Sequence, residues 1–178
     1  KDAGEAFLRI ARGHRMLFPG KVVGITGSCG KTSTKDALQL LLGRDTCLAT
    51  EGNFNNLLGV PLTLLRLEPE LHKRAVVEAG INQPGEMERL ARTIAPDLAL
   101  VTMVGPSHLE GLGAEEEVAS EKARLIRDAK SVSTAIFPED CLRFHAFREI
   151  LQGEAETLVL KLGNPREEPP LGIIYFDT

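Results

Sequence analysis

The segment KVVGITGSCGKTSTKDALQLLLGR, residues 21–44, gives the clearest indication of how this chain folds. It opens with KVVGIT (21–26), an apolar and β-branched run that predicts a buried strand. It closes with KTSTKDALQLLLGR (31–44), in which Leu38, Leu41 and Leu42 recur at helical spacing and predict a helix. The glycine-rich TGSCG (26–30) joins the two. A strand, a glycine-rich turn and a helix in this order are typical of phosphate-binding α/β proteins.

The turn between this strand and helix carries the groups that hold a nucleotide phosphate. Its glycines let backbone N–H groups wrap the phosphate, and the helix N-terminus adds partial positive charge. Lys31 can reach the β- and γ-phosphates, and the Thr32 hydroxyl can bind Mg²⁺. The spacing departs from the usual pattern, because Ile25 stands five positions before Gly30, where that pattern has a glycine. An ordinary strand-to-helix turn is the alternative interpretation.

The rest of the chain continues the alternation of strands and helices. Further strands are predicted at 46–50, 74–80, 97–103, 131–137 and 157–162, and helices at 2–12, 57–67, 84–95, 114–129 and 139–151. This pattern predicts an α/β fold with a mainly parallel sheet and helices on both faces. Ligands in such folds bind at the carboxyl ends of the strands. The expected divisions are an N-terminal helix and linker (1–20), a nucleotide-binding domain (21–163), and a connector with the start of a strand region (164–178).

Composition excludes several classes of protein. The 178 residues include 21 Lys and Arg against 25 Asp and Glu, which gives a net charge of −4 without a basic block. Together with the absence of Trp and a single Tyr, this argues against a nucleic-acid partner. Apolar runs are far shorter than the ~18–20 residues of a membrane span. The three cysteines suit neither a disulfide framework nor a zinc site, which predicts a cytoplasmic setting.

Three residues outside the turn are candidates for the same site. Glu78 ends an apolar strand, where it can bind Mg²⁺ beside nucleotide phosphates or simply emerge into solvent. His108 lies just beyond the 97–103 strand. It can contribute to the site at the ligand-binding edge of the sheet, or it can be an ordinary solvated histidine in a loop. Lys122 lies on the predicted 114–129 helix and has no acid three or four positions away, which places it on the apolar face. The alternative for Lys122 is a stem on apolar surface with its ammonium in water.

Five motifs occur in order: VVGITGSCGKTSTKDAL, GNFNNLLGVPLTLLRL, VVEAGINQPGEMERLA, PDLALVTMVGPSHLEGLG and EEVASEKARLI. Together, over residues 21–130, they resemble the central ATP-binding domain of the Mur ligases, the ATP-dependent amide-forming enzymes of peptidoglycan synthesis. The resemblance implies a P-loop NTPase-like fold. It also implies that the short TG-x-x-GKT turn is this family's own form of the phosphate loop.

The resemblance implies ATP and Mg²⁺ as cofactors and gives each candidate a role. The ATP phosphates would be held by the loop residues Gly27, Ser28, Cys29, Gly30, Lys31, Thr32 and Ser33. Either Asn55 or Asn56 would approach the γ-phosphate. Thr32 and Glu78 would hold one Mg²⁺. His108 would help to hold a second, supported by Lys122 if that lysine is carbamylated.

Within the family, NFNNLLGVPLTLL and E-x-G-x-N-x-x-GE look most like members that add D-alanyl-D-alanine to UDP-N-acetylmuramoyl-tripeptide through an acyl phosphate. Alternatives are ligases for other UDP-N-acetylmuramoyl peptides or for folate, a P-loop kinase or hydrolase, and a nucleotide-binding module without catalysis. The family's enzymes add an N-terminal domain that binds the UDP-sugar and a C-terminal domain that brings the amine. Neither fits in this chain, so we expect an excised fragment with little or no ligase activity alone.

Overall fold

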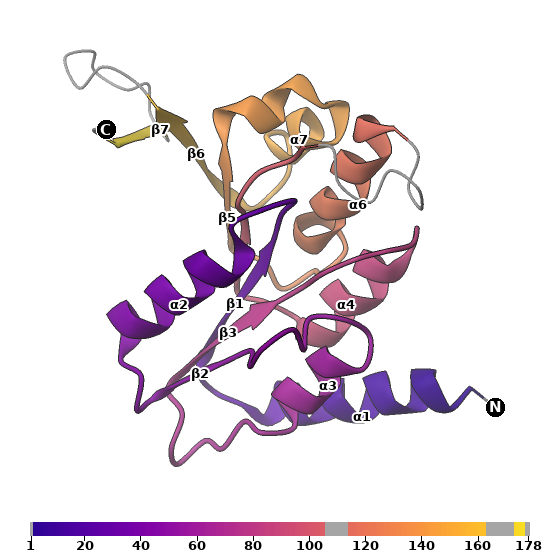
Figure 1. Ribbon diagram of the computed structural model, residues 1–178, viewed down its shortest axis with the longest axis vertical. Helices are drawn as coiled ribbons and strands as arrows, with labels where there is room; N and C mark the ends of the chain where they lie inside the picture. Colours follow the sequence, from indigo (N-terminus) through magenta and orange to yellow (C-terminus); the bar gives the residue numbers. More distant parts are fainter. Residues whose placement is uncertain (1, 106–113, 163–172, 177–178) are drawn as a thin grey trace.

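A computed structural model describes residues 2–105, 114–162 and 173–176 (Figure 1). They form a seven-stranded sheet in the order β2-β3-β1-β4-β5-β6-β7, and each neighbouring pair is parallel. The strands are β1 (Lys21–Thr26), β2 (Cys47–Ala49), β3 (Arg74–Glu78), β4 (Leu98–Val101), β5 (Thr134–Pro138), β6 (Glu156–Leu162) and β7 (Ile173–Phe176). The predicted α/β fold with a parallel sheet is confirmed.

Helices cover the two faces of the sheet unequally (Figure 1). The helices are α1 (Ala3–Leu17), α2 (Lys31–Leu42), α3 (Gly59–Leu64), α4 (Glu86–Ile94), α6 (Glu115–Arg127) and α7 (His145–Ile150), with a 3₁₀ helix η1 at Glu139–Arg143. Only α2 lies on one face among the described helices, over a small apolar cluster around Ile25 and Val76. The others lie on the opposite face and enclose the main core. No helix in the described ranges is long and apolar enough to cross a membrane.

Three predicted helices differ from those observed, and the first of these is the 57–67 helix, which is shortened to α3 at Gly59–Leu64. Helix α1 continues to Leu17 rather than ending at residue 12, because Leu8, Ala11 and Arg15 keep one face buried up to Pro19. The predicted 139–151 helix is divided into η1 and α7 at Phe144, whose backbone is extended (φ −91°, ψ 139°). Burial of the Phe144 ring in the core fixes this break, which periodicity alone does not reveal.

The buried guanidinium of Arg15 connects helix α1 to the sheet and to α4. Arg15 donates to the carbonyl oxygens of Ile94 (3.1 Å) and Ala95 (3.0 Å) and to the Asp97 carboxylate (2.9 Å). The same carboxylate accepts the Val22 N–H at 2.9 Å. Arg15 thus joins α1 to the end of α4 and to the residue before β4, and the Asp97 carboxylate extends this network to the beginning of β1.

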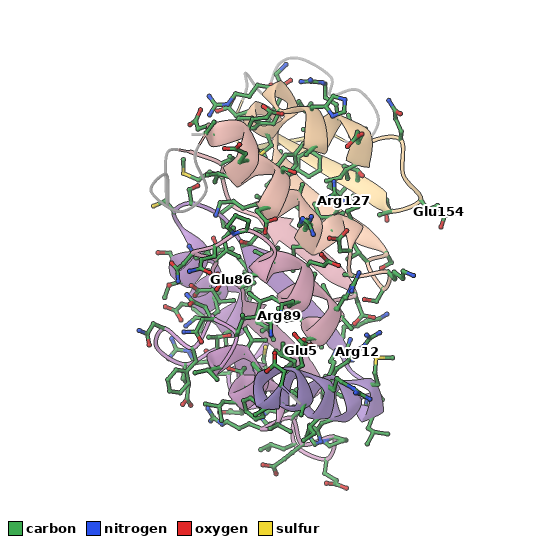
Figure 2. All side chains as sticks on the ribbon, turned by 90° about the vertical axis from the view of Figure 1, so that its right-hand side faces the viewer. Glu5, Arg12, Glu86, Arg89, Arg127 and Glu154 are labelled. Atoms are coloured by element: carbon green, nitrogen blue, oxygen red, sulfur yellow. The ribbon has the colours of Figure 1, made fainter. Side chains whose placement is uncertain are left out.

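A second contact between α1 and α4 lies on the surface. The Arg89 guanidinium of α4 pairs with the Glu5 carboxylate of α1 at 2.6 Å (Figure 2). Both side chains are partly exposed, so this pair contributes less to stability than the buried Arg15 contacts.

The sheet register brings the ends of three strands together. Ile25 of β1 is level with Glu78 of β3, and Thr26 is level with Val101 of β4. The segments that follow β1, β3 and β4 therefore leave the sheet side by side. This is the edge at which a parallel sheet binds its ligands.

Candidate functional site

The turn after β1 is shaped by two glycines and by the exit of β4. Gly27 and Gly30 have φ of +149° and +82°, and residues other than glycine rarely adopt such positive values of φ. A Cβ atom on Gly27 would lie 1.9 Å from Thr102 Oγ1. The Thr102 hydroxyl in turn donates to the Cys29 carbonyl oxygen. The loop therefore fits only because residue 27 is a glycine.

Ser28 ties the phosphate loop to the segment after β4. Its backbone N–H donates to the Met103 carbonyl oxygen at 2.9 Å. Its hydroxyl donates to the Gly105 carbonyl oxygen and accepts the Gly105 N–H, both at 3.0 Å. These contacts fix the loop before any ligand binds, which is the preorganisation that anion binding requires.

The N-terminus of α2 faces the same loop. No side chain caps this helix end within the described residues, so the first-turn N–H groups of Lys31, Thr32 and Ser33 are free for an anion. The Lys31 ammonium lies over the loop and donates to the Gly27 carbonyl oxygen at 2.8 Å. Cys29 is exposed at the tip. The seven predicted phosphate-binding residues therefore lie in the loop and in the first turn of α2.

Glu78 is the buried acid of the site, with 2% of its surface exposed. One carboxylate oxygen accepts the Thr32 hydroxyl at 3.1 Å, and the other accepts the Asn55 amide at 2.8 Å. The Glu78 N–H donates to the Thr50 hydroxyl at 2.9 Å. The alternative that Glu78 emerges into solvent is wrong.

The two candidate asparagines have different roles in the structure. Asn55 directs its side chain to Glu78, and its carbonyl oxygen accepts the Gly80 N–H at 2.7 Å. The Asn56 side chain instead accepts the N–H groups of Leu58 (3.0 Å) and Gly59 (2.9 Å) at the beginning of α3. Of the two, Asn55 is the one that reaches the site.

The residues around Glu78 fit a magnesium ion. Glu78 forms no ion pair within residues 2–105 and 114–161, although a buried carboxylate ordinarily requires a cationic partner. Its two observed partners, Thr32 and Asn55, are neutral. Carboxylate and hydroxyl oxygens are ligands that Mg²⁺ prefers. His108, the predicted ligand of a second metal, lies outside the described residues.

Lys122 is fully buried on α6, with 1% of its surface exposed. The alternative that its ammonium lies in water is therefore wrong. Burial, and secondarily the positive charge of Lys31, lower the pKa of Lys122 to about 8. A lysine with this pKa is partly neutral near physiological pH, and the neutral amine is the form that reacts with electrophiles such as carbon dioxide.

Sequence reasoning missed three polar residues that support the site. Lys35 is 6% exposed and donates to the Thr50 carbonyl oxygen at 2.9 Å, one turn of α2 beyond Lys31. Thr50 holds the Glu78 backbone, and Thr102 holds the phosphate loop. Both threonines directly follow apolar strands, and a polar residue at that place was the available signal.

Residues 25–169 match the family model of the Mur ligase middle domain. The chain belongs to the Mur ligase family. The resemblance inferred from the five motifs is thereby confirmed.

This Mur ligase domain is similar to several named ligases. It is 38% identical over 140 residues to UDP-N-acetylmuramoyl-tripeptide--D-alanyl-D-alanine ligase of Bacillus subtilis, covering 78% of this chain and 30% of the relative. It is 40% identical over 141 residues to the ligase of the same name from Escherichia coli, covering 79% of this chain and 31% of the relative. The chain thus spans about a third of the length of these relatives.

Solved structures agree with the family assignment. The MurF ligase of Thermotoga maritima in complex with ADP superposes with a TM-score of 0.78 at 30% identity, covering 90% of this Mur ligase domain and 37% of that chain. Folylpolyglutamate synthase of Mycobacterium tuberculosis superposes with a TM-score of 0.65 at 16% identity, covering 90% and 48%. The second likeness shows a shared fold alone.

Proposed function

We propose that this chain is the ATP-binding part of a cytoplasmic ligase that adds D-alanyl-D-alanine to UDP-N-acetylmuramoyl-tripeptide. The observation that carries the proposal is the convergence of Thr32 and Asn55 on the buried carboxylate of Glu78 beside the phosphate loop. Family membership and two relatives named for this reaction support the substrate assignment. Domains outside the chain would bind the UDP-sugar and bring the dipeptide.

The phosphate loop would hold ATP through its backbone N–H groups and the Lys31 ammonium. Thr32 and Glu78 would hold a magnesium ion, which supplies charge neutralisation at the phosphates. Asn55, held through its backbone and by Glu78, would present its amide toward the γ-phosphate. His108 and carbamylated Lys122 would hold a second ion. The chain thus positions and neutralises the nucleotide.

The chemistry that fits this site needs no side-chain nucleophile. The terminal carboxylate of the tripeptide attacks the γ-phosphorus of ATP, which forms an acyl phosphate and releases ADP. The dipeptide amine then attacks the acyl carbon and loses a proton, and inorganic phosphate leaves as the amide forms. Both steps depend on orientation and on stabilisation of negative charge, which are what preorganised loop amides and Lys31 provide.

Calorimetric titration of the chain with a non-hydrolysable ATP analogue and Mg²⁺ tests the proposed site. We expect binding that Lys31→Ala abolishes and that Glu78→Gln makes insensitive to Mg²⁺. Lys73→Ala, at an exposed lysine, is the matched control and should leave the affinity unchanged. Equal affinities for the Lys31→Ala variant and the wild type would contradict the proposal.

Phosphate release by the full-length gene product tests the substrate assignment. We expect release only when UDP-N-acetylmuramoyl-tripeptide and D-alanyl-D-alanine are both present. Release with a single amino acid in place of the dipeptide would assign the chain to another ligase of the family. Release from ATP alone at the same rate would instead indicate a hydrolase.

A further inference from the structure

A second polar cavity lies on the outer edge of the sheet, apart from the phosphate loop. β2 is the edge strand, and beside it the surface is hollowed to a volume of about 450 Å³. The walls come from α2, from β2 and its exit, and from the segment that precedes β3. The site described above makes no use of this cavity except through Lys35 and Thr50.

Positive charge predominates among the side chains that line this cavity. Lys35, Arg44 and Arg66 contribute three cations, and Glu51 is the one acid in the lining. Arg66 forms two contacts of 2.8 Å with Glu51, and these hold the pKa of Glu51 below its ordinary value. That carboxylate is therefore already neutralised. Lys35 is likewise paired with Asp36, so Arg44 carries the positive charge in this lining that no described acid neutralises, and that charge indicates a site for an anion.

Two of the cations have unused hydrogen-bond donors. The Lys35 ammonium, which is more than nine-tenths buried, contacts the Thr50 carbonyl oxygen at 2.9 Å and Asp36 at 3.0 Å. Those contacts leave one of its three N–H groups available. Arg44 forms no ion pair or hydrogen bond with a described residue, so its guanidinium fork is open to a ligand.

Neutral groups in the cavity also present donors. His72 accepts the Glu68 N–H on Nδ1 at 3.1 Å, so its neutral ring carries the proton on Nε2. The Thr50 N–H donates to the Val76 carbonyl oxygen of β3. The backbone N–H groups of successive residues in a strand point to opposite edges of that strand. The Ala49 N–H therefore points to the free edge. Oxyanions are bound by such a combination of charged and backbone donors.

We propose that this cavity at the edge of β2 binds an oxyanion, a phosphate or carboxylate group of a small molecule, held by Arg44, Lys35 and the Ala49 N–H. The volume accommodates a diphosphate or a small dicarboxylate. The site is separate from the ATP phosphates, because Thr50 and β2 lie between it and Glu78. It goes beyond the proposed ligase function and does not depend on it.

Titration with pyrophosphate and with succinate, each followed by amide NMR of the full chain at constant ionic strength, tests this proposal. We expect saturable shifts at Ala49, Gly52 and the Arg44 side chain. The two ligands distinguish phosphate from carboxylate chemistry, and saturation by either one supports the site. The same shifts should persist in Lys31→Ala, because that substitution weakens anion binding only at the phosphate loop.

Substitutions at Arg44 show whether the shifts report this cavity. We expect Arg44→Gln to weaken binding about tenfold or more and Arg44→Glu to abolish it. Arg9→Gln removes the same charge from an exposed position on α1 and should change the affinity less than about twofold. Shifts confined to Gly27–Ser33, or equal affinities in Arg44→Gln and the wild type, overturn the proposal.

Discussion

At the level of single residues, the position of Glu78 depends on a hydroxyl group outside the phosphate loop. Thr50 is buried, and its hydroxyl accepts the Glu78 N–H. We expect Thr50→Val to lower the free energy of unfolding by about 1–3 kcal/mol, because it leaves a buried N–H without a partner. Thr50→Ser keeps the hydroxyl and should lose less. Urea unfolding of both variants is the measurement, and equal losses would contradict this role.

Lys122 gives the chain a stability that depends on pH. Its pKa is near 10.5 in the unfolded chain and about 8 when folded. Between these values the unfolded state binds more protons, so the free energy of unfolding rises with pH. Below pH 8 the lysine is charged in both states, and the cost of burying that charge is fully present.

We therefore expect Lys122→Met to be more stable than the wild type at pH 7, by up to about 3 kcal/mol. The advantage should shrink as the pH rises from 8 to 10.5. Urea unfolding in carbon dioxide-free buffer measures the difference between the two proteins, which cancels other titrations. An advantage that stays constant with pH would mean that Lys122 is not the group responsible.

The sequence predicted Lys31, Thr32 and Glu78 because they lie in the first turn of α2 or at the last residue of β3, at the binding edge. It could not choose between Asn55 and Asn56, because both fall in one irregular turn. There only the backbone path decides which amide faces Glu78 and which caps α3. Sequence pattern therefore predicts residues at the ends of helices and strands. It does not predict the orientation of loop side chains, which depends on tertiary contacts.

Among the elements, α1 is attached through the carboxylate of Asp97. Burial raises the pKa of Asp97, but hydrogen bonds from Lys21 and the Val22 N–H and the charge of Arg15 outweigh it, and the pKa falls below its ordinary 3.8. We expect Asp97→Asn to lower the free energy of unfolding by about 2–3 kcal/mol at pH 7. The loss should diminish as the pH falls through the folded-state pKa, where the wild type also loses its charge.

The control for Asp97→Asn is Lys21→Gln, which removes an exposed partner of the same carboxylate. Because the Lys21 side chain is 75% exposed, its loss should cost less than about 1 kcal/mol. Chemical unfolding at pH 7 and pH 3 measures the loss in the free energy of unfolding for each variant and so distinguishes the two. Similar losses for both would mean that the buried Arg15 contact does not dominate the attachment of α1.

Element boundaries followed from sequence where apolar runs met clear stop signals. KVVGIT gave β1 with the bounds observed, because the run is bordered by Gly20 and the glycine-rich loop. The break at Phe144 could not be foreseen, because it follows from burial of one aromatic ring against distant residues. The expected 131–137 strand begins later, at Thr134, because Ser131 and Ser133 bond to the segment before β4.

Across the whole molecule, the site is assembled from segments far apart in the chain (Figure 1). The strand order β2-β3-β1-β4 places the phosphate loop between the exits of β3 and β4. Sequence periodicity predicted a parallel sheet, but it carries no information on which strands are neighbours. The pattern offered Glu78 only as one candidate for the site, and its pairing with Thr32, 46 positions away, came from the resemblance.

Because the nucleotide would contact loops that follow several strands, its binding should stabilise the entire domain. A ligand at a hundred times its dissociation constant adds about 2.7 kcal/mol, which raises the Tm of a domain of this size by about 5–10 °C. We expect this shift with the ATP analogue and Mg²⁺ together. Without Mg²⁺ the shift should be smaller, because Glu78 would then face the phosphates without a cation between them.

Lys31→Ala should abolish the shift, and Glu78→Gln should make it independent of Mg²⁺. Scanning calorimetry decides the matter: a wild-type Tm that does not respond to analogue and Mg²⁺ would mean that this arrangement of loops is not sufficient to hold ATP.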